Sequence, residues 1–228
     1  MADTWLLLDS GPGDPATNMA LDECLLHAAP RLGQPVLRFY GWTQPAATFG
    51  YFQHFASVET MTPLRPLIRR PTGGGLVAHD ADWTYSLTIP QSHPWYSLRA
   101  EASYRQLHEW LNAAFTRLRL PTELAPRCAK ELPGQCFAGP EKSDLVLGGR
   151  KVAGAAQRRT KAGLLIQGSI QPIPLGITQN DWQEAVCDEA CRRFQAVIRA
   201  MENDSALTQC ANNLAVGKYS QTSYNHKR

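Results

Sequence analysis

Hydrophobic and polar residues alternate most regularly over residues 83–89. Apolar side chains at every second position are typical of a strand with one apolar and one polar face. Several other short apolar runs are bounded by turn residues and predict further strands. These lie at residues 5–9, 35–42, 46–51, 67–70, 76–79 and 164–170, with two more joined by the Gly-Gly pair inside 146–152.

Apolar residues at helical spacing mark four other stretches. The first is expected to begin at Asp14-Pro15, since Asp caps helices and Pro suits the first turn, and to end before Pro30. Ser97 is expected to cap the second, which has an apolar stripe from Tyr104 onwards. The last two are predicted at about 178–201 and 205–216. Together these elements predict an α/β (α+β) fold: a mixed, largely antiparallel sheet flanked by helices, in one domain over residues 1–228.

Composition and charge exclude several classes of function. The chain has 228 residues, 43% of them hydrophobic and 19% charged, as in ordinary globular proteins. A net charge of +3 is too small to indicate nucleic acid or an anionic membrane as a partner. No apolar run has the length of a membrane-spanning helix, and the N-terminal segment lacks the features of a signal peptide. We therefore expect a cytoplasmic protein.

The chain contains six cysteines and no C-x-x-C motif. A reducing compartment disfavours disulfides, so all six are expected to be free thiols. Cys187 and Cys191 lie four residues apart on a predicted helix. They are interpreted as small buried residues rather than metal ligands, and no metal site is predicted.

A glycine-rich segment is the first candidate for chemistry. Three glycines at 73–75 directly follow a predicted strand and allow a ligand to approach backbone N–H donors. Arg69 and Arg70, just before them, are able to bind a carboxylate or phosphate. The alternative is a plain turn with solvated arginines. Neither the Walker pattern nor G-x-G-x-x-G is present.

Two more candidates follow along the chain. Lys151 lies among small residues that include Gly154 and Ala155, which leave space for a ligand chain, although a lysine near a hairpin is commonly just solvated. Cys136, in a long loop, is a candidate nucleophile if a cation is nearby, because at a typical thiol pKa of ~8.5 only a few per cent is thiolate at neutral pH. Cys128 in the same loop is the rival nucleophile.

Several spaced motifs together resemble the catalytic domain of biotin/lipoate protein ligases and octanoyltransferases, closest to the LipM-type octanoyltransferase branch. The strongest are Arg-Arg-Pro-Thr-Gly-Gly-Gly at 69–75, Gly-Arg-Lys-Val-Ala-Gly at 149–154 and Gln-Gly-Ser-Ile at 167–170. Supporting residues lie at 9–11, 18–23, 38–42, 50–53 and 225–228.

The resemblance implies a role for each candidate. Cys136, followed by Phe137, would carry an acyl group as a thioester, and Lys151 would activate this thiol and face the acyl carbonyl. The glycine-rich segment and the small residues after Lys151 would line the acyl pocket. The expected substrate-binding residues are Arg69, Arg70, Thr72, Gly73, Gly74, Gly75, His79, Gly154 and Ala155.

The implied reaction moves an octanoyl group from acyl carrier protein to a lysine of a lipoyl-domain protein, such as the glycine cleavage H protein. No cofactor is expected. One alternative is an ATP-dependent lipoate-protein ligase, although the two helices expected after residue 170 leave little room for a ligase's accessory domain. Others are a lipoyl amidotransferase and a non-catalytic paralogue that only binds its partners. A further hypothesis is that oxidation joins Cys128 to Cys136 and switches the enzyme off.

Overall fold

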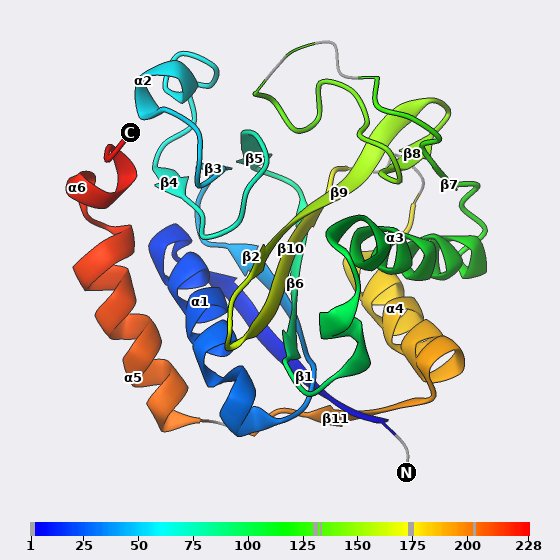
Figure 1. Cartoon of the computed structure of the whole chain (residues 1–228). Helices are drawn as coiled ribbons and strands as arrows, with labels where there is room; N and C mark the ends of the chain where they lie inside the picture. Colours follow the sequence, from blue (N-terminus) through cyan, green and yellow to red (C-terminus); the bar gives the residue numbers. More distant parts are fainter. Residues whose placement is uncertain (1–2, 130–131, 133, 173–175, 203) are drawn as a thin grey trace.

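The computed structural model describes residues 3–129, 132, 134–172, 176–202 and 204–228. Its main feature is an eight-stranded sheet with the order β11-β1-β2-β6-β10-β9-β8-β7 (Figure 1). The strands are β1 (Asp3–Gly13), β2 (Val36–Trp42), β6 (Trp83–Pro90), β7 (Glu123–Leu124), β8 (Leu145–Leu147), β9 (Arg150–Arg159), β10 (Gly163–Ile170) and β11 (Ala196–Ala200).

Strand pairing in this sheet is mixed and largely antiparallel, which confirms the predicted fold class. Among the described strands of this sheet, the parallel pairs are β1 with β2 and β1 with β11. The β8–β9 hairpin turns through Gly148 and Gly149, whose φ angles are +57° and +79°. Two successive positive φ angles are what a two-residue hairpin requires, and they suit glycine.

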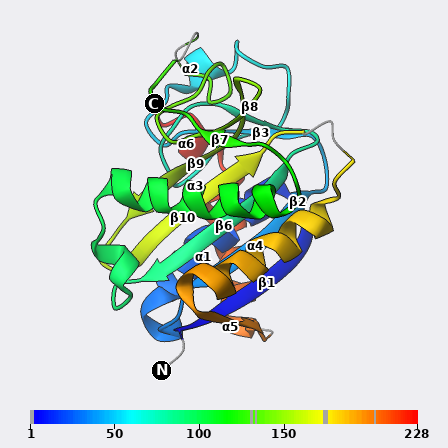
Figure 2. The ribbon, with the colours of Figure 1, turned by 90° about the vertical axis from the view of Figure 1, so that its right-hand side faces the viewer.

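Helices cover both faces of the large sheet. α1 (Pro15–Leu32) and α5 (Ser205–Leu214) lie on one face, while α3 (Ala100–Arg117) and α4 (Gln179–Phe194) lie across the other (Figures 1 and 2). No helix in the described part of the chain is both long and apolar enough to cross a membrane. The remaining helical elements are α2 (Phe55–Val58), η1 (Pro94–Ser97), η2 (Ala215–Tyr219) and α6 (Thr222–Asn225).

The alternation over β6 separates two buried layers. Its apolar residues, such as Tyr85 and Leu87, belong to the core beneath α3 and α4. Its polar residues Thr84, Ser86 and Thr88 are also buried, on the opposite face. Ser86 donates a hydrogen bond to Asp22 of α1, so this polar face meets a helix instead of water.

A second, three-stranded sheet lies at one end of the large one, with the order β4-β3-β5 (Figure 1). The glycine-rich segment connects its β4 and β5, as the prediction of two strands around that segment required. The bounds are β3 (Ala46–Phe49), β4 (Leu67–Arg69) and β5 (Val77–His79).

Three predicted helix boundaries are wrong. The helix expected to reach residue 201 ends at Phe194, because Gln195 takes a left-handed conformation (φ +54°) and the next residues form β11 beside β1. α1 continues past Pro30, which occupies its last turn, and ends at a Gly33 cap. Ser97 ends the η1 turn, and Arg99 precedes α3.

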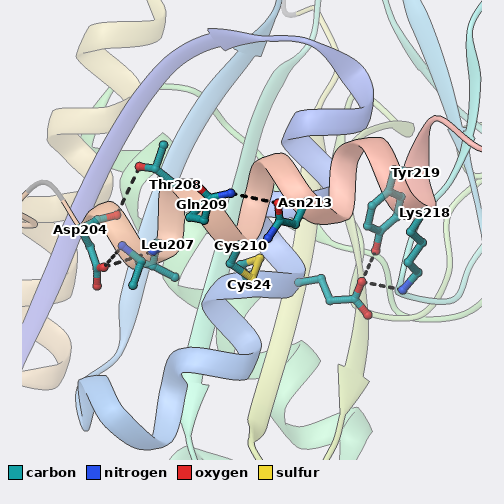
Figure 3. Close-up of a disulfide and its surroundings, with 11 residues drawn as sticks. Cys24, Asp204, Leu207, Thr208, Gln209, Cys210, Asn213, Lys218 and Tyr219 are labelled. Carbon is teal, nitrogen blue, oxygen red and sulfur yellow. Dashed lines mark hydrogen bonds and ion pairs between the residues drawn. A yellow bond between two sulfur atoms is a disulfide. The ribbon is translucent and has the colours of Figure 1, made fainter.

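The expectation of six free thiols is also wrong. Cys24 of α1 and Cys210 of α5, 186 residues apart, form a disulfide where the two helices pack together (Figure 3). This separation explains why the pairing has no local signal in the sequence. On the same side of α1, buried Glu23 accepts hydrogen bonds from Lys218 and Tyr219. Cys191, expected to be buried, is exposed, while Cys187 is half-buried.

Candidate active site around Cys136

Cys136 is held against the glycine-rich segment by backbone hydrogen bonds. Leu76 N donates to Gly134 O (2.7 Å), and Cys136 N donates to Leu76 O (3.0 Å). The side chain of Gln53 donates to the same Gly134 carbonyl (3.0 Å). These contacts make a short parallel bridge between the two segments and fix the position of the cysteine.

Two donors lie closest to the Cys136 sulfur. The Gly75 N–H donates to Sγ at 3.1 Å, and Nη2 of Arg70 lies 4.0 Å from it. A backbone N–H and a guanidinium are groups that stabilise a thiolate. Gly74, with φ +83°, lies between these donors, and a Cβ there would be 2.7 Å from Arg70 Nη2. Position 74 therefore favours glycine.

The Arg70 guanidinium is buried among neutral acceptors. Nε and Nη2 donate to the Gly73 carbonyl (3.0 and 2.5 Å), and Nη2 also donates to Gly75 O (2.7 Å). Nη1 donates to the carbonyl and hydroxyl of Thr48 (both 3.3 Å). Burial lowers the pKa of Arg70, and the Cys136 sulfur acts in the opposite direction.

Lys151 has different partners. Its Nζ forms an ion pair with Asp144 (2.6 Å) and donates to the carbonyl oxygen of Cys136 (2.7 Å). Both side chains are almost completely buried. Asp144 also accepts hydrogen bonds from Tyr104 Oη and from Glu141 N. The lysine therefore contacts the cysteine through the main-chain carbonyl of the cysteine.

Gly154 leaves room for the lysine side chain. A Cβ at this position would lie 2.6 Å from Lys151 Cε and 2.7 Å from Nζ. Any larger residue would push the ammonium away from its two partners. Gly154 therefore positions Lys151, in addition to the substrate-binding role expected from the sequence.

A narrow cleft opens beside the Cys136 sulfur. It encloses about 450 Å³, including the part that is open to solvent. Most of its exposed lining is apolar, and small residues of β9 and β10 widen it. The lining comprises Met19, Tyr40, Thr48, Arg70, Val77, His79, Thr84, Cys136, Phe137, Lys151, Gly154, Ala155, Ala156, Gln167, Gly168 and Ser169.

A buried polar network supports the cleft from the side of α1. Asp22 accepts hydrogen bonds from Arg38, Ser86 and Gln167 (each 2.7 Å). Gln167 in turn accepts from Thr72 Oγ1 (2.8 Å). Because each member is paired, the network fixes the side chains at the cleft wall.

His79 belongs to a second buried group. Its Nδ1 lies 2.8 Å from Asp82, and its Nε2 lies 2.8 Å from Thr48 Oγ1. The ring also stacks on Trp42, with centroids 4.0 Å apart. With both ring nitrogens engaged, His79 contributes a fixed surface to the cleft.

Not every expected substrate-binding residue reaches the cleft. Arg69 points to the other side, where it donates to the carbonyls of Tyr51, Gln53 and Asn225. Thr72 acts through Gln167, and the three glycines contribute backbone around the sulfur. Of the expected set, the cleft is lined by Arg70, His79, Gly154 and Ala155, together with Cys136 and Lys151.

Sequence reasoning missed the partners of these residues. Asp144 and Tyr104, which hold Lys151, lie outside the quoted motifs, and no spacing links them to it. Gln167 does open the Gln-Gly-Ser-Ile motif, which was a usable signal. The polar face of β6 gave no such signal, because its burial against α1 is seen only in the structure.

The chain is similar to known proteins in both sequence and fold. The family model for the lipoyl protein ligase A/B catalytic domain matches residues 14–171. The chain is 39% identical over 182 residues to octanoyltransferase LipM of Bacillus subtilis (strain 168), covering 74% of this chain and 65% of that protein. Octanoyltransferase LipM of Staphylococcus aureus (strain NCTC 8325 / PS 47) is 37% identical over 184 residues, covering 75% and 66%. The match thus spans just under two thirds of these relatives.

Solved structures share the fold. A lipoate-protein ligase A bound with ATP has a TM-score of 0.79 at 21% identity, over 99% of both chains. A bipartite lipoate protein ligase from Thermoplasma acidophilum has a TM-score of 0.77 at 19% identity, over 99% of this chain and 96% of that one. At these identities the likeness concerns the fold alone.

Proposed function

Because the chain belongs to the lipoyl protein ligase A/B catalytic domain family, we propose that it is an octanoyltransferase. It moves an octanoyl group from acyl carrier protein to a lysine of a lipoyl-domain protein, such as the glycine cleavage H protein. The observation that carries the proposal is the Cys136 sulfur beside an apolar cleft, 3.1 Å from the Gly75 N–H. We further propose that residues 1–228 act as one catalytic domain in the cytoplasm, without metal or cofactor.

In the first step the Cys136 thiolate attacks the carbonyl carbon of the octanoyl thioester on acyl carrier protein. A carbon–sulfur bond to Cys136 forms, and the bond to the carrier's sulfur breaks. The carrier leaves as a thiolate and takes a proton from solvent. A covalent intermediate splits a difficult transfer between two proteins into two easier steps.

In the second step the amine of the target lysine attacks the octanoyl-Cys136 thioester. A carbon–nitrogen bond forms, the carbon–sulfur bond breaks, and the Cys136 thiolate is restored. The amine loses one proton to solvent. The energy of the thioester drives formation of the more stable amide, so no nucleotide is consumed.

The chain's residues support both steps. Val77, Phe137, Ala155 and Ala156 give the cleft an apolar lining that suits an octanoyl chain. The Lys151 ammonium has three N–H donors. Asp144 and the Cys136 carbonyl engage two of them, and the third faces the acyl oxygen. One such donor is worth about 10²–10³ in rate when negative charge develops on that oxygen.

A transfer assay tests the proposal. The enzyme is supplied with a lipoyl-domain protein and either octanoyl acyl carrier protein without ATP, or free octanoate or lipoate with ATP. Mass spectrometry of the acceptor gives the readout, with Cys136→Ser as the control variant. We expect acylation from the carrier protein alone, and loss of that reaction in the control.

Each alternative predicts a different result. Modification that requires ATP and survives Cys136→Ser identifies a ligase. Transfer only from one octanoylated lipoyl domain to another identifies an amidotransferase. Binding of the acceptor without any modification identifies a non-catalytic paralogue. Any of these three results contradicts the proposed function.

A further inference from the structure

Among the residues that the structure describes, two buried cations border the cleft, and only one of them has a carboxylate partner. Lys151 is neutralised by Asp144 at 2.6 Å. Arg70, 4% exposed, donates to the carbonyls of Gly73 and Gly75 and to Thr48, and its Nη2 lies 4.0 Å from Cys136 Sγ. Among the described residues, no carboxylate forms an ion pair with Arg70. A buried cation without a counter-charge is costly, so a partner is expected.

Among the described residues, the side chains of Tyr40 and Cys136 would favour the charged form of Arg70 if they carried negative charge. Tyr40 does not suit the role of counter-ion. Tyr40 donates its hydroxyl proton to Asp22 (3.0 Å), and burial raises its pKa, so it stays neutral. The other is the Cys136 sulfur, 4.0 Å from Nη2. The Gly75 N–H points at the same sulfur from 3.1 Å and can only donate to it.

We propose that Arg70, assisted by the Gly75 N–H, is the cation that stabilises negative charge on the Cys136 sulfur, and that Lys151 does not have this role. The inference deepens the proposed function and rests on it for its meaning in catalysis. Lys151 instead anchors the cysteine loop through the Cys136 carbonyl, with its charge already balanced by Asp144.

The pairing has a consequence for the second step. When Cys136 carries the octanoyl group its sulfur is neutral, and Arg70 again lacks a counter-charge. The attack of the lysine amine breaks the carbon–sulfur bond and returns the negative charge to the sulfur beside Arg70. Arg70 therefore stabilises the leaving group in the step that completes transfer.

Alkylation of Cys136 by iodoacetamide tests the pairing without any acyl donor or acceptor. The full chain is treated at several pH values, and the rate is followed by mass spectrometry of the peptide that contains Cys136, because Cys128, Cys187 and Cys191 are also free. The variants are Arg70→Gln, Arg70→Lys and Lys151→Met. Circular dichroism confirms that each is folded.

Arg70→Gln is expected to slow alkylation at least about tenfold at neutral pH, because loss of an opposite charge within about 4–6 Å disfavours the thiolate. The rates of variant and wild type are expected to converge at alkaline pH. Arg70→Lys is expected to recover part of the loss. Lys151→Met is expected to slow alkylation at neutral pH less than Arg70→Gln does, because Lys151 contacts the main chain of Cys136 and not its sulfur. A slow Lys151→Met variant beside an unaffected Arg70→Gln variant would overturn the proposal.

If the Arg70 variants do not fold, the wild type still decides. Within one sample of the wild type, the peptide that contains Cys136 is expected to be alkylated faster at neutral pH than the peptide that contains the exposed Cys128. Slower alkylation of Cys136 than of Cys128 would contradict the pairing of Cys136 with Arg70. Since neither measurement involves acyl transfer, a failed transfer assay with a normal alkylation result would reject only the octanoyltransferase assignment.

Discussion

Arg70 and Lys151 border the same cleft as buried cations in unlike surroundings. Lys151 is held by Asp144, which is itself fixed by Tyr104, and the lysine reaches the cysteine only through its main chain. Arg70 is surrounded by carbonyls and faces the sulfur. A cation whose charge is already balanced can position a loop, whereas an unbalanced one responds to charge that appears on its neighbour.

The largest effect on the rate of transfer is expected from changing Cys136, the residue that both cations contact. Cys136→Ser is expected to lower octanoyl transfer by about a thousandfold or more, because loss of a nucleophile removes the covalent route. The initial rate of acceptor modification gives the measurement. Cys128→Ser, which alters an exposed free thiol of the same loop, is the matched control and is expected to keep the wild-type rate. The reverse result would make Cys128 the nucleophile.

Removal of the balanced cation is expected to affect both rate and stability. Lys151→Met should lower transfer by about 10²–10³, through loss of an oxyanion donor. It should also lower the free energy of unfolding by about 3–5 kcal/mol, because Asp144 is left buried and unpaired. Denaturant unfolding gives the second quantity.

A double-mutant cycle supplies the control for that prediction. The double variant Lys151→Met, Asp144→Leu is expected to lose less unfolding free energy than the two single variants lose in sum. The difference should exceed about 1 kcal/mol. Additive effects would mean that the two side chains do not act as a pair.

An intermediate effect is expected from displacing the unbalanced cation. A Cβ at Gly74 would lie 2.7 Å from Arg70 Nη2, and the φ of +83° is unfavourable for alanine. Gly74→Ala should therefore slow transfer and Cys136 alkylation by about tenfold. At Gly73 a Cβ would meet nothing within 4 Å. The matched control Gly73→Ala should therefore reduce both rates clearly less than Gly74→Ala does. Equal losses would show that the position of Arg70 is unimportant.

The smallest effect on transfer at neutral pH is expected at His108, which is fully buried and meets the Tyr104 ring edge-on. Burial lowers the pKa of His108 from 6.5 to about 4. The unfolded chain therefore binds a proton that the folded protein rejects, and stability is lost as the pH falls from 6.5 towards 4. The slope is expected to be up to about 1.4 kcal/mol per pH unit.

His108→Leu is the matched variant for this prediction, since it keeps a buried side chain of similar size without a titrating group. Unfolding free energies at several pH values give the test. The variant is expected to lose less stability than the wild type over the same range. Parallel curves for the two proteins would show that His108 does not titrate there.

The elements that carry the site could be predicted from the sequence, because their patterns are local. The alternation over residues 83–89, the glycine-rich segment between two strands and the Gly-Gly hairpin all appear as expected. β11 could not be predicted, since it depends on the left-handed Gln195 and on pairing with β1 at the far end of the chain. The Cys24–Cys210 disulfide likewise depends on how α1 and α5 pack.

The adjacent arginines show where sequence reasoning about the site ends. Arg69 and Arg70 look equivalent in the motif, yet successive side chains leave an extended chain in opposite directions. Arg69 therefore meets backbone carbonyls near Tyr51 and Asn225, while Arg70 meets the sulfur. The resemblance to the family predicted that Cys136 and Lys151 come together, but the identity of the group at the sulfur required the fold.

The most direct test of the account is to trap the acyl-enzyme. The protein is incubated with octanoyl acyl carrier protein and no acceptor, and its peptides are mapped by mass spectrometry before and after treatment with hydroxylamine. We predict one octanoyl group on Cys136, removed by hydroxylamine and transferred when a lipoyl-domain protein is added. Octanoylation of another residue, or transfer to the acceptor by Cys136→Ala, would contradict the account.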